Sequence, residues 1–340
     1  MRITIFKFFV LLPLISLSQI INNSYNCLNI NSSSKISSMG GELFSIIDKD
    51  VSLASQVPSL LNPKMDNQIS FNFIDYVSDI NFISFHSARL LPEGFMMFFG
   101  VDAFNYGIFD SYDESGNYIN QFKANQQIFT LGSSKAISDR ILLGTNIRFL
   151  NSKLEDYYSL SISSNISITY DSENNFSSTI LIKNIGRPII RYTSITEDLP
   201  LEVQLGFSKT LEHLPFKYSL VIHNLNKYDI SNDYNLNAIY DPSSNSLLYE
   251  DETVSKKILR HIIIGGELNP FNKALYFRGG FNFQKREDLR LSNSFNMSGF
   301  SFGLGLNLKE FQINYSRNIY HVSSMVNSFS IITNLSNFMF

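Results

Sequence analysis

Residues 300–308 read FSFGLGLNL, a stretch in which large apolar side chains alternate with small or polar ones. In an extended strand, such alternation makes one face apolar and leaves Ser301, Gly303, Gly305 and Asn307 on the other. The ranges 141–149, 201–207 and 277–283 repeat the pattern. The sequence offers no amphipathic helix to cover these apolar faces, which in water would form a large exposed patch. The pattern therefore predicts strands that face lipid on one side and a lumen on the other.

Alternating segments of roughly ten residues, the length of a tilted membrane strand, recur from residue 68 to the end of the chain. An even number of strands is expected of a closed bacterial barrel. We predict an all-β fold, a closed antiparallel transmembrane β-barrel of about 14 strands over residues 67–340. The expected strands are 68–76, 79–88, 94–106, 122–137, 139–151, 157–171, 175–186, 200–211, 215–226, 258–268, 274–287, 297–308, 310–321 and 326–340.

The connections between these strands predict an orientation. The even-numbered connections are short, whereas the longest, 107–121, 187–199, 227–257 and 288–296, are all odd-numbered. Outer-membrane barrels have short periplasmic turns and longer extracellular loops. We therefore expect the amino terminus on the periplasmic side and residues 227–257 outside the cell.

The amino terminus predicts export. Arg2 and Lys7 flank the apolar run 8–17, which is too short to span a bilayer and ends in Ser16-Leu17-Ser18. We interpret residues 1–18 as a cleaved signal peptide, which directs the chain to the bacterial outer membrane. No later run of 18 apolar residues predicts a transmembrane helix. The net charge of −3 gives no electrostatic case for nucleic acid as a partner.

Residues 19–66 do not alternate. Their Gly, Pro and short apolar runs, such as Met39-Gly40-Gly41 and Val57-Pro58-Ser59-Leu60-Leu61, predict an irregular segment. We expect it to fill the barrel as a plug, and a periplasmic tail is the alternative. Charges enclosed in a plugged lumen need partners. We therefore expect plug acids to pair with inward arginines, although these arginines could instead bind an anion; the residues concerned are Asp48, Asp50, Arg140, Arg148, Arg278 and Arg286.

The loop 227–257 interleaves acids with tyrosines, which interfaces favour. It is a candidate partner-docking surface, able to attract a basic partner or Ca²⁺, and a solvated acidic loop is the alternative. Its candidate residues are Tyr228, Asp229, Asp233, Tyr234, Tyr240, Asp241, Tyr249, Glu250, Asp251 and Glu252.

Catalytic and metal-binding patterns are absent from the sequence. Three of the five histidines, His213, His223 and His261, lack the spacing of metal ligands, and no Gly-x-Ser-x-Gly elbow appears. The single Cys27 does not follow the apolar run as a lipoprotein cysteine would. We predict a non-enzymatic protein without cofactor or metal.

The order of several short motifs resembles a known family. These include Met39-Gly40-Gly41, the Val57–Leu61 stretch, Lys183-Asn184-Ile185-Gly186, His223-Asn224-Leu225 and Arg278-Gly279-Gly280-Phe281-Asn282. Together they resemble the PorQ family of the type IX secretion system of Bacteroidetes, which is related to the FadL-like fourteen-stranded barrels. Val57 departs from the Asn that the family pattern has at this position.

The resemblance implies an anchor rather than an enzyme. It implies an attachment complex in which the barrel tethers a PorZ-like surface protein beside a PorU-like sortase and a PorV-like barrel. That complex links secreted cargo to lipopolysaccharide, and outer-membrane lipid surrounds the barrel. The alternative is a FadL-like transporter of hydrophobic small molecules, which needs an apolar site in the lumen, a lateral opening and a movable plug. The inward faces of the expected strands are mostly polar, which favours the anchor.

Overall fold

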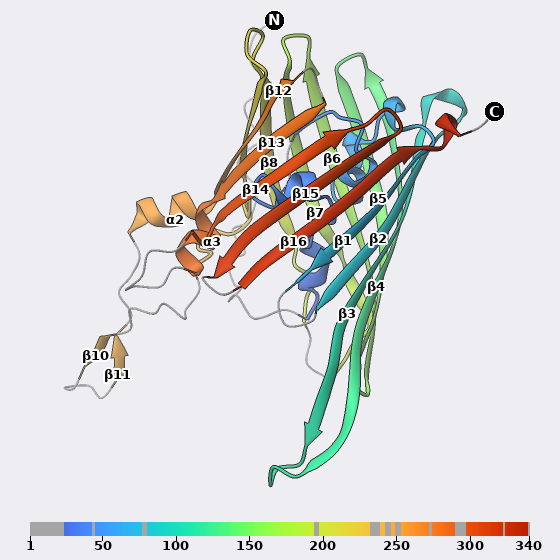
Figure 1. Cartoon of the computed structure of the whole chain (residues 1–340). Helices are drawn as coiled ribbons and strands as arrows, with labels where there is room; N and C mark the ends of the chain where they lie inside the picture. Colours follow the sequence, from blue (N-terminus) through green and yellow to red (C-terminus); the bar gives the residue numbers. More distant parts are fainter. Residues whose placement is uncertain are drawn as a thin grey trace, which may run out of the picture.

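A computed structural model shows that fourteen of the described strands close into one antiparallel barrel (Figure 1). Strand neighbours follow chain order, except that β9 pairs with β12 and β1 closes the barrel against β16. The closed fourteen-stranded antiparallel barrel predicted from the sequence is confirmed. The structure describes residues 24–42, 45–76, 80–193, 197–231, 239–241, 246–248, 253–271, 274–289, 297–321 and 324–338. The predicted signal peptide lies outside these residues.

The barrel strands range from seven to 21 residues. They are β1 (Gln68–Asp75), β2 (Asn81–Leu90), β3 (Met96–Tyr112), β4 (Tyr118–Ser138), β5 (Ile141–Leu154), β6 (Tyr157–Ser172), β7 (Phe176–Ile190), β8 (Glu202–Thr210), β9 (Phe216–Ile222), β12 (Ile262–Phe271), β13 (Leu275–Asn282), β14 (Phe300–Asn307), β15 (Phe311–His321) and β16 (Ser324–Asn334). A separate two-stranded hairpin comprises β10 (Ile239–Asp241) and β11 (Ser246–Leu248).

Short helical turns precede the barrel and connect its strands. They are η1 (Asn26–Asn29), α1 (Ser34–Ser37), η2 (Val51–Ser55), η3 (Pro58–Leu60), η4 (Pro63–Met65), η5 (Pro92–Gly94), α2 (Val254–Arg260), α3 (Phe283–Asp288) and η6 (Leu335–Asn337). No described helix is long and apolar enough to cross a membrane.

The two ends of the barrel differ. The short-turn end carries the connections 91–95, 139–140, 173–175, 211–215 and 308–310, whereas the long-loop end carries 191–201, 223–261 and 283–299. Strands β3 and β4 extend far beyond their neighbours at the long-loop end (Figure 1).

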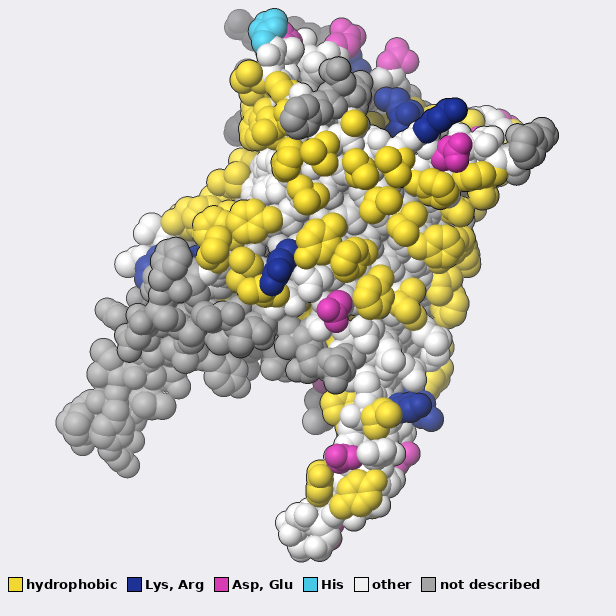
Figure 2. Space-filling model, viewed as in Figure 1, with side chains coloured by type: hydrophobic (Ala, Val, Ile, Leu, Met, Phe, Trp, Pro, Cys, Tyr) yellow, Lys and Arg dark blue, Asp and Glu magenta, His cyan; other side chains and the backbone are white. Residues whose placement is uncertain are grey.

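The outer and inner faces of the wall follow the alternation. Apolar side chains such as Phe71, Phe129, Ile147, Phe302 and Phe329 are exposed on the outside. Hydrophobic side chains cover most of the wall visible in Figure 2. The residues between them, mostly Ser, Thr and Asn, are buried toward the lumen. A surface of this kind is stable when lipid surrounds it.

Residues 24–42 and 45–66 lie inside the barrel, where Figure 1 shows them surrounded by strands. We call them the plug. Proline at the first position of η3 and η4 suits a helical start, because its missing N–H would have no partner there. The Asp50 carboxylate caps η2 by accepting a hydrogen bond from Ser52 N at 2.9 Å.

Short polar side chains on the wall bind the irregular backbone of the plug. Asn146 Nδ2 donates to Ser55 O at 2.9 Å, and Asn165 Nδ2 donates to Gln56 O at 3.0 Å. On the opposite wall, the plug nitrogen Ser34 N donates to Ser330 Oγ at 3.1 Å. A buried backbone without regular structure needs such partners. The plug therefore explains why the lumen face is rich in Ser and Asn.

The predicted loop 107–121 is mostly strand, so that prediction was wrong. Phe109 stacks on Phe122 with ring centroids 5.3 Å apart, and Gln121 Nε2 donates to Asp110 Oδ1 at 2.9 Å. The turn that remains is 113–117, in which Asp113 Oδ1 accepts from the backbone nitrogens of Ser115 and Asn117. These cross-strand pairs extend the β3–β4 ladder beyond the barrel.

At three of the strand boundaries that differ from the expected ones, the structure has a helical segment instead. Residues 258–260 belong to α2, and 283–287 belong to α3, which begins where Asn282 Oδ1 accepts from Lys285 N at 3.0 Å. Strand β16 ends at Asn334, whose side chain caps η6. At Asn282 and Asn334, a capping side chain thus ends a strand that alternation alone continues.

Candidate functional site

The lumen near the long-loop end contains a buried apolar cluster. Wall strands supply inward aromatic and aliphatic side chains, and η1 fills the space between them. We call this group the apolar cluster; its buried members are Tyr25, Cys27, Leu28, Ile74, Phe82, Phe104, Ile128, Leu150, Leu199 and Val326. Phe82 and Phe104 meet with ring centroids 4.4 Å apart, and Tyr25 stacks on Tyr192 at 5.8 Å. The expectation of a mostly polar lumen is therefore wrong at this level of the barrel.

Arg148 of β5 lies beside the apolar cluster and is almost completely buried. It donates to Leu28 O at 2.9 Å and to Asn184 Oδ1 at 3.2 Å, both neutral acceptors. Among the described residues, no carboxylate lies within ion-pair distance of its guanidinium, and its Nε has no partner. A buried charge without a counter-ion is costly. The expected pairing of Arg148 with a plug acid is not observed, although the residue does contact the plug.

Asn184 marks an irregularity in the barrel wall. Its backbone has a positive φ of 58°, which Asn tolerates better than most residues. The ladder between β7 and β8 ends at Lys183, and β7 continues to Ile190 paired only with β6. The Asn184 Nδ2 group bridges the interval by donating to Pro200 O at 2.9 Å and Asn29 Oδ1 at 2.7 Å. We call this interval the β7–β8 break.

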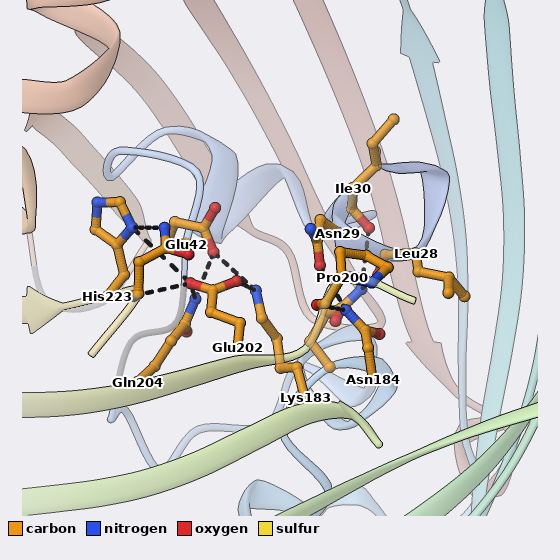
Figure 3. Close-up of polar contacts among 12 residues, drawn as sticks. Leu28, Asn29, Ile30, Glu42, Lys183, Asn184, Pro200, Glu202, Gln204 and His223 are labelled. Carbon is orange, nitrogen blue, oxygen red and sulfur yellow. Dashed lines mark hydrogen bonds and ion pairs between the residues drawn. The ribbon is translucent and has the colours of Figure 1, made fainter. Parts of the chain in front are cut away.

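A charge cluster lies at the β7–β8 break, and it comprises Glu42, Lys183, Glu202, Gln204 and His223 (Figure 3). The Lys183 Nζ atom lies 2.7 Å from Glu202 Oε2 and 3.2 Å from Glu42 Oε2. Gln204 Nε2 also donates to both carboxylates, at 2.6 and 2.9 Å. Because Glu42 belongs to the plug and the other four to the wall, these contacts fasten the plug.

His223 completes the charge cluster in a neutral form. Its Nε2 lies 3.0 Å from Arg260 O and therefore donates to it, and its Nδ1 accepts from Asn224 Nδ2 at 2.8 Å. The remaining candidate histidines have other roles. His261 Nδ1 donates to His223 O at 2.8 Å, and His213 is exposed in a short turn. The sequence showed no signal that would pair His223 with Glu202.

A second ionic network joins the plug to β12 and β13. Lys35 of the plug pairs with Asp48 and lies 3.2 Å from Glu267, which in turn accepts from Arg278 Nε at 2.7 Å. Asp48 and Arg278 thus share a network but do not touch. Asp50 accepts from Ser33 Oγ at 2.9 Å and pairs with no predicted arginine.

Two predicted lumen arginines lie elsewhere. Arg140 is in the turn between β4 and β5, where its half-exposed side chain pairs with Glu173 at 2.5 Å. The alternation was extended one residue too far, because β5 begins at Ile141. Arg286 lies on α3 rather than on a strand, so the two-residue period that placed it inward does not apply.

The predicted docking loop is described only in part. Tyr228 is exposed, and Asp229 Oδ2 lies 2.5 Å from Lys257 Nζ of α2. Partial burial favours the neutral acid, but hydrogen bonds from Lys257 and Ser231 outweigh it and lower the pKa of Asp229 to about 2. Tyr240 and Asp241 belong to β10, and their side chains are outside the described part. The rest of the set is also outside it, namely Asp233, Tyr234, Tyr249, Glu250, Asp251 and Glu252.

Within the described ranges, no three His, Cys, Asp or Glu side chains gather as metal ligands would. His86 of β2 is instead paired with Asp102 of β3, at 2.9 Å between Nε2 and Oδ1. The pair is buried in the wall and escaped sequence analysis because its two strands had no known register.

Comparison with known proteins places the fold. No family model matches the chain, and no curated protein matches its sequence. The CymD monoaromatic hydrocarbon channel is similar at a TM-score of 0.53 and 9% identity, over 92% of this chain and 99% of CymD. The toluene transporter TodX of Pseudomonas putida gives 0.51 and 12%, over 89% and 96%. A Pseudomonas aeruginosa FadL homologue gives 0.52 and 9%, over 89% and 98%. The chain therefore has the same barrel fold as these proteins.

Proposed function

We propose that this barrel takes up hydrophobic small molecules that carry an acid group across the bacterial outer membrane. The observation that carries the proposal is the apolar cluster with Arg148 at its edge. An apolar site with one buried cation suits a molecule whose hydrocarbon part replaces the η1 side chains and whose acid pairs with Arg148. The fold is shared with barrels described as a hydrocarbon channel and a toluene transporter, which supports transport of hydrophobic molecules; the acid group is inferred from Arg148 alone.

Part of the plug must move for such a molecule to enter. No described ion pair holds the η1 segment; its hydrogen bonds include Tyr25 Oη to Ser159 Oγ at 3.1 Å, Gln56 Nε2 to Leu28 O at 3.2 Å and the one from Arg148 to Leu28 O. The described ion pairs of the plug are instead formed by Lys35, Glu42 and Asp48, which lie farther along the chain than η1. We therefore propose that η1 is displaced when a ligand enters, while the rest of the plug stays in place.

The β7–β8 break offers a lateral path beside the apolar cluster. Past Lys183, the backbone of β7 lacks the β8 partner that closes the wall elsewhere. Unpaired backbone is tolerated at membrane depth only beside protein or a wet cavity. Opening the Asn184–Pro200 bridge would connect the cluster to the lipid side.

Equilibrium binding of radiolabelled oleate and oleyl alcohol to the whole protein in uncharged detergent tests the proposal. Hydrogen bonds to charged groups contribute about 1.5–3 kcal/mol, so oleate should bind roughly tenfold or more tightly than the alcohol. Arg148→Gln should remove this preference. Arg140→Gln, which removes an exposed arginine, should leave it unchanged. Absence of binding by both ligands, or an unaltered preference in Arg148→Gln, would contradict the proposal.

The anchor of an attachment complex is the second candidate function, and the projecting β3–β4 hairpin favours it. Its exposed side chains Ile108, Tyr112, Tyr118 and Ile119 lie beyond the other strands, where a PorZ-like surface protein could bind. Interfaces favour such tyrosines. The acidic loop 227–257 remains a proposed second contact for this partner, and neither PorU-like nor PorV-like partners have a proposed surface.

Replacement of residues 108–122 by a two-residue turn tests the anchor. Affinity purification from native outer membranes should recover a PorZ-like protein with the intact chain and lose it with the shortened hairpin. Cargo should then be secreted but not attached to the cell. Normal surface retention of cargo in a strain lacking the whole barrel would exclude this function.

A further inference from the structure

A cavity of about 240 Å³ lies between the plug and strands β6–β9 at the short-turn end. It is lined by Ile46, Ile47, Lys64, Asp171, Asn175, Ser177, Ser208, Lys209, Thr210 and Lys217. A water molecule takes roughly 30 Å³ of liquid volume, so the cavity has space for about eight. It is separate from the apolar cluster and contributes nothing to the function proposed above.

Three lysines from three different elements line this cavity. Lys64 comes from η4, Lys209 from β8 and Lys217 from β9. In the described part of the chain, none of their ammonium groups has an ion-pair or hydrogen-bond partner. Asp171 is the one acid in the lining, so three positive charges face one negative charge and leave an excess of two.

The adjacent ionic network does not neutralise this excess. It contains Lys35 and Arg278 against Asp48 and Glu267, two charges of each sign that are paired with one another. Lys217 lies within electrostatic range of all four, whose formal charges sum to zero. The positive charge of the three lysines is therefore available to a ligand.

We propose that the cavity binds a phosphate monoester group. An excess of two positive charges matches a phosphate dianion, and lysine ammonium groups bind tetrahedral phosphate as point charges. Ile46 and Ile47 supply an apolar surface for the organic part of the ligand. Because the cavity lies at the short-turn end, the phosphate comes from a soluble ester or from a lipid head group in the adjacent leaflet.

Isothermal titration calorimetry on the whole protein in an uncharged detergent tests the soluble source, with inorganic phosphate and glycerol 3-phosphate as probes. Nanodiscs containing phosphatidic acid, compared with phosphatidylcholine alone, test the lipid source. Saturable binding in either format supports the site, and the format in which it occurs identifies the source. We expect Lys209→Gln/Lys217→Gln to weaken binding at least tenfold. Lys123→Gln, on the exposed β3–β4 hairpin, should bind as the unaltered protein does.

Folding of the variants is checked by their heat-dependent migration in SDS gels. Should the double variant fail to fold, Lys64→Glu on the exposed edge of the plug provides a second test and should also weaken binding. Failure of all three probes to bind the unaltered protein would overturn the proposal, as would equal binding by a folded lysine variant. Binding of oleate is unaffected by these variants, so the result is independent of the function proposed above.

Discussion

Lys183 lies on the lumen side of β7, with its ammonium group between Glu202 of the wall and Glu42 of the plug. Its replacement by Met keeps the length of the side chain but leaves the buried Glu202 and the partly buried Glu42 without their cation. Removal of one partner from a buried pair costs about 3–5 kcal/mol. We expect Lys183→Met to lower the urea midpoint of unfolding strongly, and Arg140→Gln, at an exposed pair, to cost at most about 1 kcal/mol. Equal midpoints for both variants would show that the charge cluster does not stabilise the plug.

Asp229 permits a test by pH outside the barrel wall. Its pKa in the folded protein, about 2, is below the ordinary aspartate value of 3.8, so its contact with Lys257 stabilises the loop above pH 4. That contribution declines as the pH falls through about 2, and it is small because the carboxylate is partly exposed. A ¹³C NMR titration should place the Asp229 midpoint near 2 and move it upward in Lys257→Gln. An unchanged midpoint in this variant would remove Lys257 as the cause.

Individual residues also show where sequence reasoning ends. Alternation places Lys183 and Arg148 toward the lumen, but two of their partners, Glu42 and the Leu28 carbonyl, belong to a plug whose path has no periodic signal. Glu42 approaches Lys183 across 141 residues of sequence, and only the folded plug brings them together. The positive φ of Asn184, which shapes the β7–β8 break, likewise depends on tertiary contacts.

At the scale of elements, two wall glycines permit the close approach of the plug. A Cβ atom on Gly280 would lie 2.2 Å from Met39 C, and one on Gly144 would lie 2.2 Å from Pro58 C. Overpacking of this kind costs about 1–3 kcal/mol. We expect Gly144→Ala and Gly280→Ala to loosen the plug and increase ion conductance through single barrels in planar bilayers. Gly279→Ala, whose nearest neighbour would be 3.9 Å away, is the matched control and should conduct as the unaltered protein does.

The elements themselves were predictable to different degrees. The wall strands follow from alternation because one face meets lipid and the other meets the plug. Boundaries were missed where a local hydrogen bond ends a strand, as the Asn282 cap does before α3. Strand boundaries were also missed where cross-strand pairs such as Phe109–Phe122 extend a strand. The apolar cluster was missed because its members come from separate strands with one or two inward apolar residues each.

At the scale of the whole molecule, the strand order and register fix which connections share an end, but the orientation in the membrane remains a prediction from loop length. Cysteine labelling tests it, because Cys27 is the single cysteine of the sequence and is buried. We expect a membrane-impermeant maleimide to label Glu114→Cys, at the tip of the β3–β4 hairpin, on intact cells. Glu212→Cys, in a short turn, should react only after the outer membrane is permeabilised. The reverse pattern would place the hairpin in the periplasm, and the lysine-lined cavity would then face the outside of the cell.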